Sequence, residues 1–231
     1  MTQPIETGTI SENEIMELLN AFAEGLLVRS RFFRFWKTEG VHPDICKKFL
    51  VSFDSLVKSF PALIADGVAR ARDEETREVL MMNLYQERGE GDLSRTHYTI
   101  YRKFLTTAGI DTASIEENDF ATEWGTRLSK YIQEAGNISA VLGALTAGEF
   151  LAQPVLGRIY KVLQSRYAEA DQEYFTKHLD LETEHVRELT QLLAHQAEKE
   201  GNFREVLTGF KFGLSVWEAY FNRLADFLSK A

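Results

Sequence analysis

Proline is rare in this sequence, with four residues in 231. Because proline breaks a helix when it stands in the interior, its rarity permits long helices almost everywhere. Apolar residues recur at helical intervals from end to end, and we find no alternating strand pattern of useful length. No stretch between the expected helices is long enough to be a domain linker. The sequence predicts an all-α protein of about seven to nine helices. A flexible segment is expected over residues 1–10 and one helical domain over residues 11–231.

Start and stop signals place the expected helices. Ser11 and Glu14 have capping-box spacing, and the helix they open is expected to continue through Phe33 and Trp36. A second helix is expected to begin at His42-Pro43 and to end where Pro61 interrupts it, with a short helix after it. Further helices are expected over roughly 73–88, 94–108, 114–134, 138–167, 171–199 and 202–230.

Net charge and cysteine content limit the partners and the compartment. The formal charge is −9 and the pI is about 5.2, which argues against nucleic acid or an anionic membrane as the main partner. One cysteine excludes an intrachain disulfide and suggests a reducing compartment. The apolar stretch 138–160 carries Glu149 and Arg158, which would be costly in lipid. We expect a cytoplasmic protein with a small-molecule substrate and no nucleic-acid or membrane partner. A homodimer remains open.

The strongest functional signal lies in the helix expected over residues 171–199. At 100° per residue, Glu182 lies about 40° and His185 about 20° from His178, on the same stripe as several leucines. Asp180 and Glu184 point to the opposite side. A buried carboxylate needs compensation, and this spacing stacks three ligand-capable side chains around a common centre. A metal site is favoured over the alternative, a polar cluster satisfied by internal hydrogen bonds.

Two other segments supply further candidate ligands. Glu149 projects from the middle of an apolar stripe in its expected helix, and no basic residue of that helix faces it. Glu87 ends one expected helix and His97 lies at the start of the next, with a Gly-x-Gly turn between them. Such a turn can bring both side chains to one point, whereas Glu90 in the turn is expected to be solvated.

Together these segments offer six oxygen and nitrogen ligands and no thiolate. Such a set suits two divalent ions, iron or manganese by ligand type, with zinc as an alternative. A chain of this size folds without a structural metal, so a functional metal site is the natural interpretation. The predicted ligands are Glu87, His97, Glu149, His178, Glu182 and His185.

At these residues the chain resembles the heme-oxygenase-like di-iron oxidases and oxygenases, relatives of the thiaminase and pyrroloquinoline-quinone synthase fold. The segment from Asn83 to His97 is similar to that family's first ligand pair, and Glu149 to its lone central glutamate. His178-x3-Glu182-x2-His185 is similar to its ligand-bearing helix. The motifs cover roughly residues 80–193.

The resemblance implies a heme-oxygenase-like helical bundle with a non-heme di-iron site. It further implies two Fe(II) per chain, with Mn as an alternative, and dioxygen as co-substrate. The reaction would be oxidation of a small organic substrate, such as a fatty acid or an amino-acid-like molecule, with no catalytic residue beyond the metal ligands. Heme is not expected, since no histidine precedes His42. The alternative is a non-catalytic iron-binding or partner-binding protein of the same fold.

Overall fold

The computed structural model describes residues 11–36, 41–200 and 203–230, and for residues 35, 181–183, 199 and 200 only the backbone. The segment expected to be flexible, 1–10, lies outside the described residues. Within the described part all regular structure is helical, which confirms the all-α prediction. The α-helices are α1 Glu12–Arg29, α2 Arg31–Trp36, α3 Pro43–Arg70, α4 Glu74–Glu87, α5 His97–Thr107, α6 Asp119–Glu134, α7 Ile138–Arg166, α8 Glu173–Glu200 and α9 Phe203–Leu228.

The helix starts follow the local sequence closely. The capping box at Ser11 is formed, with the Ser11 side chain accepting from the Glu14 backbone and the Glu14 carboxylate accepting from the Ser11 backbone. Asp73 and Asn137 cap α4 and α7 by accepting from backbone N–H groups in the first turn. These caps satisfy N–H groups that have no partner inside the helix.

Three expected helix boundaries are wrong. Helix α6 begins at Asp119, capped by Asn118, and not at about residue 114, because residues 112–114 form a separate 3₁₀ helix. The first helix does not continue to Trp36, because the backbone at Ser30 is extended and separates α1 from α2. Pro61 does not end a helix either, since α3 runs through it to Arg70. An interior proline costs about 3 kcal/mol or more. Buried residues before and after it, including Val57 and Leu63, hold both halves of α3 against the core.

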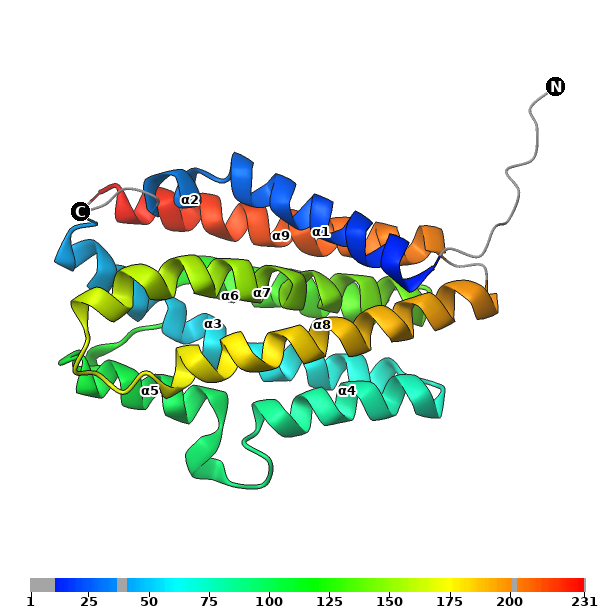
Figure 1. The fold of residues 1–231 in the computed structure, drawn as a ribbon, viewed down its shortest axis with the longest axis horizontal. Helices are drawn as coiled ribbons and strands as arrows, with labels where there is room; N and C mark the ends of the chain where they lie inside the picture. Colours follow the sequence, from blue (N-terminus) through cyan, green and yellow to red (C-terminus); the bar gives the residue numbers. More distant parts are fainter. Residues whose placement is uncertain (1–10, 37–40, 201–202, 231) are drawn as a thin grey trace.

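Helix α7 runs through the centre of the molecule. Figure 1 shows α1, α2 and α9 along one side of it, with α4 and α5 along the other and α8 beside them. Among the described helices, its packing on α9 and α8 is the most extensive. The α7–α9 contact depends on glycine, because a side chain at Gly143 or Gly209 would overlap the backbone of the facing helix. Since α7 and α8 lie against each other, Glu149 on α7 comes close to the ligand-type residues on α8.

By length and composition alone, α7 is the one described helix that could cross a membrane. In the structure, however, 78% of its most apolar window is buried inside the protein. The apolar composition of α7 is therefore explained by its position in the protein core.

Candidate metal centre

Glu87 and His97 meet across a tight turn between α4 and α5. Gly89 and Gly91 adopt φ angles of 79° and 90°, in the left-handed region that favours glycine. Thr96 then caps α5, which places His97 in its first turn. Oε1 of Glu87 lies 2.8 Å from Nδ1 of His97, although the contact lacks the angle of a hydrogen bond. The turn thus brings an oxygen and a nitrogen ligand together, as the sequence predicts.

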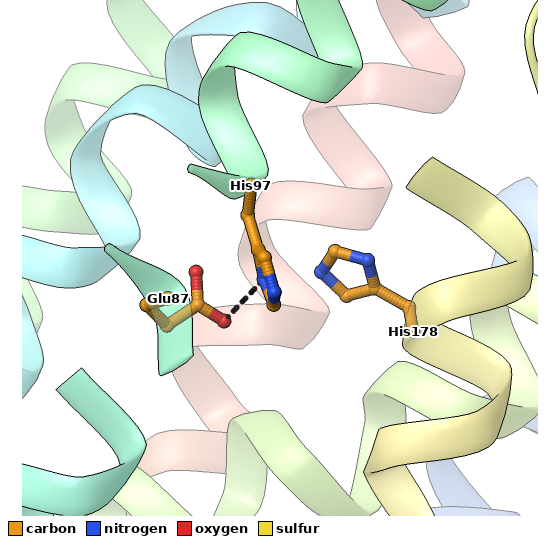
Figure 2. A group of neighbouring side chains, drawn as sticks. All are labelled: Glu87, His97 and His178. Carbon is orange, nitrogen blue, oxygen red and sulfur yellow. Dashed lines mark ion pairs between the residues drawn. The ribbon is translucent and has the colours of Figure 1, made fainter. Parts of the chain in front are cut away.

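His178 completes a first group of ligands from a distant part of the chain. Figure 2 shows its ring, carried by α8, facing His97 and Glu87. The ring centroids of His97 and His178 are 4.3 Å apart. Each of the three residues offers one ligand atom within 4.8 Å of the others, and all three are buried. We call Glu87, His97 and His178 the first ligand group.

The backbone fixes which nitrogen of His178 is available. Its Nδ1 lies 2.7 Å from the carbonyl oxygen of Tyr174, one turn earlier in α8. Because a carbonyl oxygen only accepts, Nδ1 must carry the hydrogen, which leaves the Nε2 lone pair free to bind a cation. The Tyr174 ring also packs on the imidazole, with centroids 4.2 Å apart. The orientation of His178 is therefore set before any ligand binds.

A second group of ligand-type side chains lies between α7 and α8. Oε2 of Glu149 is 3.5 Å from Nδ1 of His185, and both residues are buried. Nδ2 of Asn83 donates to Oε1 of Glu149 at 3.0 Å. Nε2 of His185 donates to Oε1 of Gln86 at 2.6 Å. With Nε2 protonated, Nδ1 of neutral His185 turns a lone pair toward the Glu149 carboxylate, so a proton or a metal ion is needed between them. We call Glu149 and His185 the second ligand group.

Glu182, the remaining predicted ligand, lies on α8 between His178 and His185, but its side chain is outside the described residues. Its role as a ligand stays a prediction. Its neighbours Asp180 and Glu184 are exposed, as the helical phase of α8 predicts.

The two groups perturb their histidines in opposite directions. Burial, together with the neighbouring His97, holds the pKa of His178 well below its usual value. Burial would also lower the pKa of His185, but the contact with Glu149 and the charges of Glu149 and Glu87 outweigh it and raise that pKa. His178 is thus neutral and ready to bind a cation, whereas a proton competes for the position between His185 and Glu149.

Buried polar atoms without a hydrogen-bond partner indicate whether metal ions fit this site. Among the described residues, Nδ1 and Nε2 of His97 and Nδ1 of His185 are buried without a hydrogen-bond partner. Buried polar atoms without a partner are costly, and native structures contain few of them. Here they coincide with convergent carboxylates and imidazoles, a ligand set that suits iron, manganese or zinc. The residues present therefore fit metal ions.

The sequence interpretation gave no role to Asn83 and Gln86. They hold the second ligand group and stand on the same face of α4 as Glu87, at i, i+3 and i+4. The sequence shows that these residues share a helix face, but it does not show that their hydrogen-bond partners lie on α7 and α8. The two histidines outside the predicted site remain outside it. His195 pairs with Glu75 at the surface, and His42 accepts a backbone hydrogen bond at the start of α3.

An apolar cavity adjoins both ligand groups. Its volume is about 60 Å³, and Glu87, Glu149 and His178 form part of its wall. The rest of the wall comes mainly from α3, α7 and α9 and includes Phe53, Phe60, Gly148, Val155, Trp217 and Phe221. Ligand-type side chains at the edge of an apolar pocket are typical of a site that binds a small molecule.

Residues 47–218 match the sequence model of a family described as iron-containing redox enzymes. None of the curated proteins is significantly similar to the chain.

The solved structures that share the fold include three from different organisms. A CADD-like protein of unknown function from Nostoc punctiforme has a TM-score of 0.78 at 17% identity, over 93% of this chain and 97% of that one. A domain of unknown function with a heme oxygenase-like fold from Shewanella denitrificans has a TM-score of 0.73 at 14% identity, over 96% and 94%. A TenA homologue from Pyrococcus furiosus has a TM-score of 0.66 at 20% identity, over 91% and 99%. These likenesses confirm the predicted heme-oxygenase-like fold.

Proposed function

The chain belongs to the family of iron-containing redox enzymes, and from this premise we propose that it is a non-heme di-iron oxidase or oxygenase. The two ligand groups would each hold one iron ion, with Glu182 completing the second. The observation that carries the proposal is the burial of three imidazoles and two carboxylates close together, where Nδ1 and Nε2 of His97 and Nδ1 of His185 have no hydrogen-bond partner among the described residues.

Ferrous iron bound there would supply the electrons that reduce dioxygen, which the neighbouring side chains cannot supply. The protein's own contribution is to position and protect. Tyr174 holds His178 through its backbone oxygen and its ring. Asn83 and Gln86 hold Glu149 and His185. The ligand-type side chains are buried, and burial strengthens electrostatic interactions inside the site.

Anaerobic Fe(II) titration followed by exposure to dioxygen tests the proposal. Elemental analysis should give up to two iron ions per chain, and rapid mixing with oxygenated buffer should consume dioxygen. A candidate substrate should accelerate this consumption and be oxidised. Without stoichiometric iron or manganese after reconstitution, the ligand assignment would be wrong. Iron that accumulates beyond two per chain would favour the non-catalytic alternative.

Hydrogen exchange gives a second readout that does not depend on activity. Metal bound between the ligand groups should protect α8 around residues 178–185 more than the rest of the chain, because this segment would carry three of the six ligands. A uniform change, or a change remote from α8, would contradict the site.

A further inference from the structure

Helix α4 reverses the ordinary distribution of polar and apolar side chains. Its inner face carries Asn83 and Glu87, which are buried at the ligand groups. Its outer face carries Met81, Met82 and Tyr85, which are 49%, 43% and 51% exposed. A helix at the surface of a protein normally turns its apolar stripe to the core and its polar residues to the solvent. The outer face of α4 is therefore apolar where contact with water would favour polar side chains.

Exposed apolar residues are concentrated at this helix. Of the six large hydrophobic residues that are exposed in the described part of the chain, four lie between Met81 and Leu93. Figure 1 shows α4 at the edge of the bundle, where it packs mainly on α3 and α8. Single exposed hydrophobic residues are ordinary, whereas a group of them on one surface marks an interaction site.

The outer face of α4 carries a stripe of side chains with opposite charges at its two ends. The stripe consists of Glu78, Met81, Tyr85 and Arg88. Spacings of three, four and three residues are those of a coiled-coil seam, so the four side chains leave the helix on one side. All four are exposed. The stripe thus runs from an acidic end through an apolar centre to a basic end, and we call it the α4 stripe.

Tyr85 is held in place by its own chain. Its hydroxyl donates a hydrogen bond to the carbonyl oxygen of Glu90, 2.7 Å away in the turn after α4. The polar end of the side chain therefore has a partner, while about half of the residue stays exposed. Contact with a ring that is already held costs little side-chain entropy. Met81, one turn earlier, has a flexible side chain that adapts to a facing surface.

The order of the charges distinguishes the ways in which two copies of the stripe can meet. In a parallel pair, Glu78 would face the partner's Glu78 and Arg88 the partner's Arg88, and such like-charge contacts are unfavourable. In an antiparallel pair with its twofold axis near residue 83, Glu78 would face the partner's Arg88, and Met81 the partner's Tyr85. Twofold symmetry makes each of these contacts twice. The stripe is therefore complementary to a second, antiparallel copy of itself.

We propose that the α4 stripe is a self-association surface, through which two copies of this chain form an antiparallel, twofold-symmetric dimer. The stripe lies on the side of α4 opposite Asn83 and Glu87, so the contact leaves the ligand groups unchanged. A pair of 14-residue helices belongs to the small end of specific interfaces. The dimer is accordingly expected to dissociate in the micromolar range.

Sedimentation equilibrium of the full, metal-free chain from about 1 µM to about 500 µM tests the proposal. The average mass should rise with concentration from 26.4 kDa toward twice that value. A monomer at every concentration would overturn the proposal. Because no metal is present, this result is independent of the proposed di-iron function.

Met81→Glu and Val28→Glu locate the interface. Both replace an exposed apolar residue with a carboxylate, but Val28 lies on α1. Met81→Glu should weaken the dimer at least about tenfold, because its carboxylate would be pressed against the partner's Tyr85 without a counter-charge. Val28→Glu should leave the dissociation constant unchanged. Equal dissociation constants in the two variants, with the fold intact by circular dichroism, would place the interface elsewhere and overturn the proposal.

Charge reversal tests the antiparallel order. Glu78→Arg and Arg88→Glu should each weaken self-association about tenfold or more, because each creates two like-charge contacts per dimer. An equimolar mixture of the two variants should recover the dimer, since their heterodimer has opposite charges at both contacts. The double variant should recover it for the same reason. A mixture that stays as monomeric as its components would rule out the antiparallel contact.

Discussion

The two ligand groups are built differently. In the first group, Glu87 and His97 are ten residues apart and are joined by one glycine turn, and His178 faces them from α8. In the second group, Glu149 and His185 come from two long helices and are held by amide side chains from a third, α4. The first group therefore depends mostly on a local turn, and the second on how α4, α7 and α8 pack together.

This difference predicts that the two ligand groups bind metal with different affinities. The first group already has three ligand atoms within 4.8 Å of one another and a neutral His178, so little reorganisation is needed on binding. In the second group, a proton competes for the space between His185 and Glu149. We expect the first group to bind its ion more tightly and over a wider pH range.

The largest effect is expected from removing a ligand of the first group. Glu87→Ala should weaken the tighter ion by more than about 100-fold, because a ligand is lost outright rather than one of its supports. Iron stoichiometry after reconstitution should fall from two to one or below. Glu78→Ala removes the same charge from an exposed position of the same helix and should leave stoichiometry unchanged. If Glu87→Ala removed only the weaker ion, the first ligand group would be the one with the lower metal affinity.

Glu182→Ala and Glu184→Ala test the second group by removing the same charge two residues apart on α8. The first should abolish binding of the weaker ion or its reactivity with dioxygen. The second should have little effect, because Glu184 is exposed and pairs with Arg187 at the surface. Metal titrations of both variants provide the measurement. Equal effects would show that the helical phase of α8 does not select the ligands.

Gln86→Leu should have a smaller effect on the same ion. Losing the acceptor for Nε2 of His185 frees the ring to turn, and loss of such a supporting partner typically costs about 10–100-fold in metal affinity. Gln86→Glu keeps an acceptor oxygen and should retain most of the affinity. Gln191→Leu, an exposed glutamine on α8, is the control. A uniform loss at both ions would indicate general destabilisation instead.

The smallest effect concerns pH and the metal-free chain. The pKa of His178 is lower in the folded than in the unfolded protein, so the unfolded chain binds more protons below about pH 6.5. Because of His178, the free energy of unfolding therefore decreases as the pH falls below about 6.5, by at most about 1.4 kcal/mol per pH unit. The pKa of His185 is raised, so its contribution is present at low pH and is lost as pH rises through its folded value.

Chemical denaturation at several pH values separates the two contributions. His178→Gln should flatten the loss of stability on the acid side, and His185→Gln should flatten the loss above about pH 6.5. The same slope in both variants would show that the two groups do not differ in protonation.

Much of the fold was readable from local sequence because helix formation is a local process. The capping box at Ser11 and the glycine turn after Glu87 formed as expected. The failures occurred where tertiary packing overrides local preference. Pro61 should end a helix, but buried residues on both sides of it hold α3 together.

For the candidate site, sequence determined which residue types stand on which helix face. Period and turn chemistry placed Glu87 beside His97, and put His178 and His185 on the buried side of α8 with Glu184 outside. Only the tertiary structure decided that Asn83 and Gln86 on α4 reach Glu149 and His185, 66 and 99 residues away. It also decided that the Phe60 ring packs directly against Gly148. Periodicity indicates which way a side chain points on its own helix, whereas its partners depend on the packing of whole helices against one another.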